Sequence, residues 1–377
     1  MLFDIDSPDH PARLAAILSR AFDERVEIAR VERLAPWAVA RCYLATSGAS
    51  VPPSVVVKWL RSDPNNYRTD PAQLLTECAA LSFLDDLGLG VAPQVIGPAQ
   101  AGIVVIEDLT PRQPLSDLLA GRAPGASEGL LAFARTLGGL HAGTAGRADA
   151  YYGRRVSLGP VDPQFERVRY FASGLDEAVA IADQLDIGMS TGAAQDAATL
   201  RQTLAEPGAF LALSNGDPGF NNFLVKGPDG RIIDFESAGY RHALSDAACL
   251  HVPNSIWLTV GDSIRDGSES EYRRALARAV PEAEDDHVFG LGLAAGCLAV
   301  AIERFSRFWK LDARVPGDES RLQLISTLEA ACRAAEHHRS LPQLVGWLRS
   351  VTEFLRHRWP DADVDLASVE PFSPRRG

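Results

Sequence analysis

One loop of the sequence carries side chains that could do chemistry: it reads SNGDPGFNNFLV, at 214–225. It follows an apolar run at 209–213, and its glycines and proline favour a turn over a helix. Asp217 could accept a proton from a hydroxyl group, and Asn222, five residues later, could offer an amide oxygen to Mg²⁺. The alternative is an ordinary polar turn, so the loop alone leaves both interpretations open.

A further carboxylate lies at the end of the segment that follows. Residues 223–236 read FLVKGPDGRIIDFE, which predicts a hairpin of two apolar strands joined by a Gly-Pro-Asp-Gly turn. We expect Asp234 to end the second strand and to return to the side of Asn222. A carboxylate and an amide oxygen make a hard-oxygen site suited to Mg²⁺ with a phosphate. The simpler alternative is that Asp234 caps the next segment.

Two charged residues lie in apolar surroundings in the first third of the chain. Lys58 is the charged residue of SVVVKWL, a predicted strand at 54–60, and a buried lysine needs a partner. Glu77 lies on a predicted helix whose positions four and seven residues later, Leu81 and Leu84, are apolar. The glutamate would then point inward and could meet Lys58. Alternatively, Lys58 reaches water from an edge strand and Glu77 lies at the core boundary.

The elements that must position these residues change character along the chain. Strands are predicted at 26–34, 39–45, 54–60, 91–97 and 102–109, with helices at 11–22 and 70–90. Further helices are predicted at 115–119, 130–144, 163–184 and 193–205, and between about 243 and 355. The chain is therefore predicted to be α+β, with two lobes and a cleft between them. We expect a small β-rich N-lobe at 1–106, a hinge at 107–113 and a larger, mostly helical C-lobe at 114–377.

The order of the polar features indicates one kind of chemistry. A strand lysine, a helix glutamate, a connector, an Asp-x4-Asn loop, a hairpin and a further aspartate are the parts of a kinase-type phosphoryl-transfer site. Such a transfer needs little covalent chemistry from the protein. It needs clamped phosphates, a metal that offsets their charge, and an oriented acceptor hydroxyl.

In this arrangement the sequence resembles the aminoglycoside phosphotransferase and choline kinase-like family, which has the protein-kinase fold. The family's catalytic loop, roughly HGDxxxxN, is similar to NGDPGFNN at 215–222, and its I-D-W/F-E motif is similar to IIDFE at 232–236. GIVVIEDL at 102–109 is similar to the strand that enters the hinge, and LGGLHAGT at 137–144 to the family's LxxLH helix. The resemblance runs from about residue 26 to residue 250.

The resemblance implies an ATP- or GTP-dependent enzyme that phosphorylates a hydroxyl of a small molecule. Lys58 would hold the α- and β-phosphates and would be oriented by Glu77. The backbone of Glu107, Asp108 and Leu109 would bind the nucleotide base.

The same resemblance assigns the second half of the site. Asp217 would be the catalytic base, and Asn222 and Asp234 would ligate Mg²⁺. Asp246 lies where the family carries an aspartate that braces the loop after the metal site. Glu236 would lie near the acceptor or the metal loop.

Two departures from the family pattern bear on activity. Asn215 stands where the family usually has histidine, and hydrogen bonds from its amide could substitute. The loop expected to cover the phosphates, at 32–44, has no glycine, so its backbone would approach a phosphate less closely. A nucleotide-binding pseudokinase with a regulatory role is therefore the main alternative. A helical structural protein with coincidental motifs is a third.

The acceptor is less well defined by the sequence. A formal net charge of −12 argues against nonspecific nucleic-acid or membrane partners, which need a cationic face. The C-lobe segment at 151–204 and the helices after His251 would form the acceptor site, and the acidic residues of that segment, with the net charge, slightly favour an amino-bearing compound such as an aminoglycoside. Choline-like compounds, amino acids, sugars and macrolides remain open, and no oligomeric state is predicted. The acidic residues in question are Asp162, Glu166, Asp176 and Glu177.

Three further features predict a cytoplasmic protein. The five scattered cysteines lack any C-x-x-C pair, which is typical of reduced thiols. The N-terminal residues do not have the pattern of a signal peptide. The longest apolar run, at 289–302, is shorter than the roughly 20 residues that span a bilayer and is interpreted as a buried helix.

Overall fold

The computed structural model describes residues 10–35, 38–45, 50–60, 69–100, 102–168, 171–253 and 262–365. The chain divides into two compact units. Unit 1 contains Met1–Arg112, Asp149–Val161 and Arg231–Ala238. Unit 2 contains Gln113–Ala148, Asp162–Gly230 and Gly239–Gly377. The first boundary falls inside the connector expected at 107–113, and two later segments return to unit 1.

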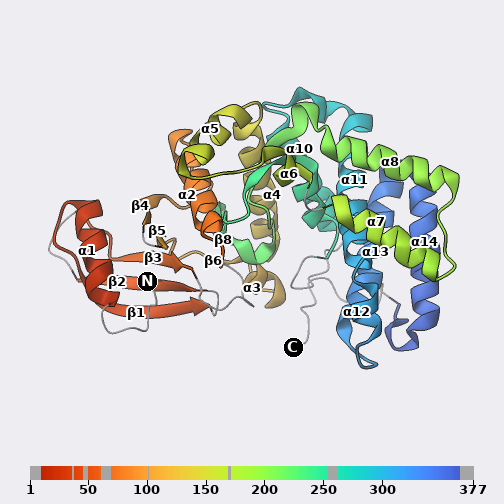
Figure 1. Ribbon diagram of the computed structural model, residues 1–377, viewed down its shortest axis with the longest axis horizontal. Coiled ribbons are helices and arrows are strands. Elements are labelled where there is room, and N and C mark those ends of the chain that lie inside the picture. Colours follow the sequence, from red (N-terminus) through yellow and green to blue (C-terminus); the bar gives the residue numbers. More distant parts are fainter. Residues whose placement is uncertain are drawn as a thin grey trace. The chain divides into compact units, whose positions relative to one another are not determined.

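Unit 1 is built on a five-stranded antiparallel sheet in the order β1-β2-β3-β5-β4 (Figure 1). All five strands were predicted, but the strand expected at 91–97 begins later, at Val95. The bounds are β1 Glu27–Ala35, β2 Val39–Ala45, β3 Ser54–Trp59, β4 Val95–Gln100 and β5 Ile103–Glu107.

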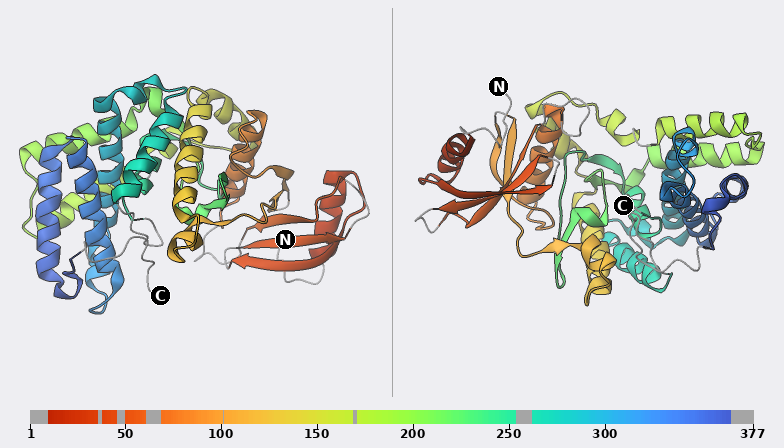
Figure 2. Two further views of the ribbon diagram at one scale, coloured as in Figure 1. Left: turned by 180° about the vertical axis from the view of Figure 1, so that it is seen from behind. Right: turned by 90° about the horizontal axis from the view of Figure 1, so that it is seen from below.

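The side chains of β3 alternate between the two faces of this sheet. Val55 and Val57 pack with Leu14 and Leu18 of α1 (His10–Phe22) in one apolar core. Because successive side chains of a strand point to opposite faces, Lys58 points away from that core. It points to the side covered by α2 (Pro71–Asp86), and Figure 2 shows α1 and α2 on either side of the sheet.

Helix α2 begins as the sequence predicts and is held by a helix that the sequence analysis missed. Asp70 and Gln73 form a capping box at its start. The missed helix is α5 (Ala148–Leu158), of which residues from Asp149 on belong to unit 1. Its buried Arg155 donates from Nε to Thr76 Oγ1 of α2, at 3.0 Å.

Unit 2 is mostly helical, as predicted. Helix α4 packs on α10, α11 on α13, and α14 on both α13 and α8. The helix expected at 130–144 begins four residues earlier, and the one expected at 163–184 is two helices, α6 and α7. The bounds are α4 Ala126–Thr144, α6 Pro163–Val168, α7 Ala172–Gln184, α8 Thr191–Ala205, α10 Asp262–Leu276, α11 Asp286–Phe305, α13 Glu319–His337 and α14 Pro342–Arg358; the shorter helices are α3 Leu115–Ala120, α9 Ala243–Ala247 and α12 Phe308–Asp312.

Glycines let two of these helices approach their neighbours closely. A Cβ at Gly138 of α4 would lie 2.5 Å from the carbonyl oxygen of Tyr272. A Cβ at Gly296 of α11 would lie 2.7 Å from the carbonyl oxygen of Leu244. The glycines in the run GLGLAAG therefore serve helix packing.

Helix α11 is longer than the apolar run from which it was predicted, because it includes polar residues at both ends. With 20 residues, it is the one helix of the described residues that is long and apolar enough to cross a membrane, judged by length and composition. The expectation that this run is too short was therefore wrong for the helix as a whole. However, 67% of its most apolar window is buried inside the fold, as in a core helix.

Two small antiparallel sheets, of two and three strands, carry the polar loops of unit 2. Strand β7 (Leu211–Ser214) pairs with β10 (Gly239–His242). Strand β6 (Gln113–Pro114) pairs with β8 (Phe223–Lys226), which continues through a turn at 227–228 into β9 (Asp229–Ile232). The predicted hairpin is present. Asp234 does not end its second strand but lies two residues beyond it.

Candidate active site

The loop between β7 and β8 presents Asp217 on a fixed backbone. Asp217 is exposed, whereas Asn215 is fully buried beneath it. The amide of Asn215 donates from Nδ2 to the carbonyl oxygen of Asp217 at 3.1 Å and accepts from its N–H at 3.3 Å. The asparagine that replaces the family's histidine thus binds both backbone polar groups of the neighbouring aspartate.

Asn222 folds back onto Asp217, so the five-residue spacing brings the two side chains together. Asn222 Nδ2 donates to Asp217 Oδ2 at 2.9 Å and to the carbonyl oxygen of Asp217 at 3.0 Å. Its amide oxygen accepts from Asn221 Nδ2 at 3.0 Å. A Cβ at Gly219 would lie 2.5 Å from Asn221 Oδ1, so a larger residue there would displace the side chain of Asn221.

A buried network ties this loop to the helices behind it. Ser214 Oγ accepts from the N–H of Gly216 at 2.9 Å and donates to Asp246 Oδ1 at 2.8 Å. The other oxygen of Asp246 lies 3.2 Å from His141 Nε2, and His141 Nδ1 lies 2.8 Å from the hydroxyl of Tyr272. His141 is fully buried and therefore packs rather than meeting a substrate. No sequence pattern indicated Ser214 or Tyr272, because their hydrogen-bond partners Asp246 and His141 lie far away in the sequence.

Lys58 lies among carboxylates of unit 1. Its ammonium donates to Glu77 Oε1 at 2.5 Å and to Asp234 Oδ1 at 2.8 Å. Lys58 and Glu77 are buried, and the side chain of Asp234 is 28% exposed. Glu77 also accepts from the N–H of Phe235, at 3.4 Å. Asp234 has a φ of 65°, a left-handed conformation that aspartate tolerates better than most residues.

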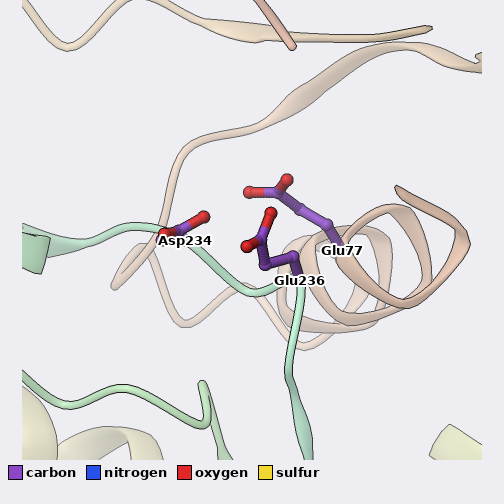
Figure 3. A group of neighbouring side chains, drawn as sticks. All are labelled: Glu77, Asp234 and Glu236. Atoms are coloured by element: carbon purple, nitrogen blue, oxygen red, sulfur yellow. The ribbon is translucent and has the colours of Figure 1, made fainter. Parts of the chain in front are cut away.

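A third carboxylate, Glu236, completes what we call the acidic cluster: Glu77, Asp234 and Glu236 around Lys58. Figure 3 shows the three carboxyl groups converging, one from α2 and two from the segment after β9. One oxygen of each lies within 4.8 Å of the others. Glu77 Oε2 is buried and has no hydrogen-bond partner among the described residues. An excess of hard oxygen donors with one orphaned atom fits a divalent cation.

The two predicted Mg²⁺ ligands belong to different units. Asp234 lies in unit 1 and Asn222 in unit 2. Their joint coordination of one ion therefore stays a prediction.

The predicted nucleotide-binding segment follows β5 and is fixed by one side chain. Asp108 Oδ2 accepts from Arg41 Nε at 2.7 Å and from Ser54 Oγ at 2.6 Å, while Oδ1 accepts from Thr110. Burial alone would raise the pKa of Asp108, but these bonds hold it below its ordinary value. Asp108 therefore acts here as a structural clamp.

The neighbours of Asp108 differ in their backbone bonding. The N–H of Glu107 donates to the carbonyl oxygen of Gln94 at 2.9 Å. Among the described residues, the N–H of Leu109 donates to no protein group. Leu109 thus offers the donor that a base edge would need.

A cavity of about 510 Å³ lies within unit 2 beside the loop between β7 and β8. Gly216, Asp217, Pro218 and Gly219 line one part of it. The remainder includes residues of α6, α8, β10, α11, α12 and α13 and residues near Asp246. The exposed carboxylate of Asp217 therefore faces a space large enough for a small ligand.

Comparison with known proteins shows the family of this chain. The model of the phosphotransferase enzyme family, APH, matches residues 60–283, which is more than half of the chain. The chain belongs to this family. The matched range includes Glu77, Asp217, Asn222 and Asp234, whereas Lys58 lies two residues before it. No relative of this family member was found among curated proteins.

Solved structures show its fold. The amicoumacin kinase hAmiN, in complex with AMP-PNP, Ca²⁺ and Ami, is 15% identical with a TM-score of 0.51, covering 80% of this chain and 88% of that one. A choline/ethanolamine kinase family protein from Mesorhizobium loti is 16% identical, with a TM-score of 0.46 and coverage of 85% and 93%. The gentamicin complex of APH(2")-IIa is 14% identical, with a TM-score of 0.47 and coverage of 88% and 98%. This phosphotransferase family member has a protein-kinase-like α+β fold.

Proposed function

We propose that this small-molecule phosphotransferase is an ATP- and Mg²⁺-dependent kinase that transfers the γ-phosphate to a hydroxyl group. The observation that carries the proposal is the exposed carboxylate of Asp217, held by Asn215 and Asn222 at the edge of a cavity. A carboxylate so placed can accept the proton of a hydroxyl nucleophile. The hydroxyl oxygen forms a bond to the γ-phosphorus, the bond from that phosphorus to the bridging oxygen breaks, and ADP leaves.

Lys58 and the acidic cluster would hold the triphosphate end of the nucleotide. In our proposal Lys58 binds the α- and β-phosphates and Glu77 orients it, which the 2.5 Å contact between the two supports. Asp234 and Asn222 would hold Mg²⁺, with Glu236 as a further carboxylate near it. The ion, when bound, would neutralise phosphate charge. The free N–H of Leu109, next to Glu107 and the clamped Asp108, would donate to the base of ATP or GTP.

Asn215 favours an active enzyme over a pseudokinase in this proposal. Its two hydrogen bonds to Asp217 do the positioning that the family's histidine would do. The five cysteines are buried and form no disulfide, which supports a reducing compartment such as the cytoplasm.

The proposal is tested by ADP release in the presence of ATP and Mg²⁺, with water or a panel of hydroxyl compounds as acceptor. We expect Asp217→Asn to lower the rate by about 10²–10⁴-fold, since that is the usual contribution of a general base. Asp229→Asn, at the exposed hairpin turn, is the matched control and should leave the rate unchanged. Equal rates for wild type and Asp217→Asn would refute the role of Asp217. Nucleotide binding without turnover on any acceptor would instead support the pseudokinase.

A further inference from the structure

The cavity beside Asp217 has a charge opposite to that of the whole protein. The chain carries a formal net charge of −12. The cavity is nevertheless lined by six basic side chains and three acidic ones, Asp217, Asp246 and Glu303. We call it the basic cavity. Its basic residues are Arg167, Arg241, Arg304, Arg307, Lys310 and Arg314.

Three of these cations form no ion pair with any carboxylate of the described residues. Arg167 has a buried Nε with no hydrogen-bond partner there. Lys310 is exposed and uses no side-chain bond within the described part of the chain. Arg304 donates to Thr327 Oγ1 at 2.6 Å, and burial lowers its pKa to about 10, so it stays charged at neutral pH.

The other cations of the basic cavity are already bonded. Arg307 pairs with Glu303, and Arg314 pairs with Asp318 at 3.0 Å. Arg241 donates to Ser214 Oγ at 3.2 Å and to a backbone oxygen of α6, also at 3.2 Å. The ion pairs compensate the charges of Arg307 and Arg314, whereas no carboxylate of the described residues pairs with Arg167, Arg304 or Lys310.

The acidic side chains Asp246 and Glu303 of the lining also have partners. Asp246 accepts from Ser214 and contacts His141, and Glu303 pairs with Arg307. His242 also lines the cavity, and burial together with the nearby His141 lowers its pKa to about 3, so it is neutral. Asp217 is therefore the one acidic group of the lining that we assign to chemistry.

The cationic groups come from separate parts of the fold. Arg304 follows Val300 at helical spacing on α11, Arg307 is the N-cap residue of α12, and Lys310 lies on α12. Arg167 lies on α6, more than a hundred residues earlier in the chain. Arg167 and Arg304 are partly buried, so an anion beside them would offset charge that water screens incompletely, whereas the exposed Lys310 is hydrated and could add a further contact.

We propose that the acceptor is an anionic hydroxyl compound, a phosphate ester or a carboxylate, whose anionic group binds Arg167, Arg304 and Lys310 while its hydroxyl faces Asp217. The assignment rests on the proposed function, because it names the acceptor of the same site. Arginine recognises phosphate and carboxylate by charge-assisted, often bidentate, hydrogen bonds. A volume of about 510 Å³ accommodates a compound of sugar-phosphate size.

This inference replaces the expectation of an amino-bearing acceptor. None of the acidic residues behind that expectation lines the cavity. Asp162 caps α6, Asp176 pairs with Arg201, Glu166 is buried against Gly239, and Glu177 is exposed. A cationic acceptor would bring its charge next to three uncompensated cations, which costs free energy.

The first experiment compares ligands of one shape and different charge. Calorimetric titration of the full chain without nucleotide would use glucose 6-phosphate, glucuronate, glucose and glucosamine, which share a pyranose ring. We expect saturable binding of at least one anion, weaker binding of glucose, and the weakest binding of glucosamine. Added salt should weaken the anion's binding. The two anions separate phosphate from carboxylate recognition. Tighter binding of glucosamine, or no anion binding at millimolar concentration, overturns the proposal.

The second experiment removes the cations one at a time. Arg167→Gln and Lys310→Met should each weaken anion binding about tenfold, since each removes a charged hydrogen-bond donor. Arg278→Gln and Lys226→Met, both exposed and outside the cavity, are the matched controls. Unchanged binding in both cavity variants would overturn the proposal.

Phosphate transfer is then measured separately. Anion binding without a rate loss in Asp217→Asn would contradict the proposed function and leave the ligand class standing. Phosphate transfer to a cationic acceptor in preference to every anion would support the proposed function and contradict the anionic acceptor.

Discussion

The acidic cluster of unit 1 and the basic cavity of unit 2 have opposite charge balances. Around Lys58, three carboxylates converge on one ammonium group, and an oxygen of Glu77 is left without a partner. In the basic cavity, three cations pair with no carboxylate of the residues that the structure describes. The cluster therefore has capacity for a cation, and the cavity has capacity for an anion.

The contrast between the two sites indicates that the pairing of nearby charges, and not the net charge of the protein, decides which ligand charge a site favours. Most of the protein's charges lie on the surface, where solvent and salt screen them. Buried charges are screened much less, so one unpaired arginine affects a ligand more than many exposed acids do. The charge of −12 consequently has little influence on the choice of acceptor.

The largest effect that we expect comes from removing the cation at the centre of the acidic cluster. Lys58→Met should lower the free energy of unfolding by about 3–5 kcal/mol, because it leaves the buried carboxylate of Glu77 unpaired. Chemical denaturation measures the change. Adding Glu77→Gln to that variant should restore part of the loss. Lys226→Met, at an exposed lysine, should change little. Wild-type stability of Lys58→Met would show that the cluster is not charged as described.

We expect an intermediate effect on stability from the protonation of His242, which lines the basic cavity. His242 accepts from the N–H of Leu244 through Nδ1 at 3.2 Å and stacks on Phe210, and its folded-state pKa of about 3 lies below the usual value of 6.5. The unfolded state therefore takes up the proton first, and stability falls as the pH drops from about 6.5 towards 3. Between pH 7 and pH 5 this histidine should cost about 2 kcal/mol.

The pH effect is measured by denaturation of wild type and His242→Asn. Asparagine can still cap α9 but does not titrate. The variant should show the shallower pH dependence of the two. His251, whose pKa burial lowers to about 4, should keep part of the dependence in both proteins. The same pH slope in both would contradict the neutral state of His242.

We expect the smallest effect on stability from a substitution in the loop beside the basic cavity. Asn215→Ala should cost about 1 kcal/mol of stability, because it removes two hydrogen bonds to the backbone of Asp217. The rate of ADP release should fall as well, since Asp217 would lose its positioning. Asn215→His should lower the rate less than alanine does. An unchanged rate of ADP release in Asn215→Ala would show that Asn215 does not position Asp217.

Much of the fold could be predicted because its signals are local. Apolar alternation placed the strands of unit 1, and helical spacing with the Asp70 cap placed α2. Helix α5 was missed because its buried Arg155 becomes favourable only through Thr76 of a distant helix. The break between α6 and α7 was missed because the periodicity continues across it.

The sequence by itself determined which residues could do chemistry, because residue type and short spacing carry that information. Asp217 and Asn222 meet through five residues of one loop. Tertiary structure alone decided which charges are paired, because partners such as Lys58 and Asp234 are 176 residues apart. It also decided that Arg167, Arg304 and Lys310 share one cavity. Pairing depends on distances that only the packed chain sets, and those distances support our proposal of an anionic acceptor in place of the amino-bearing one expected from the sequence.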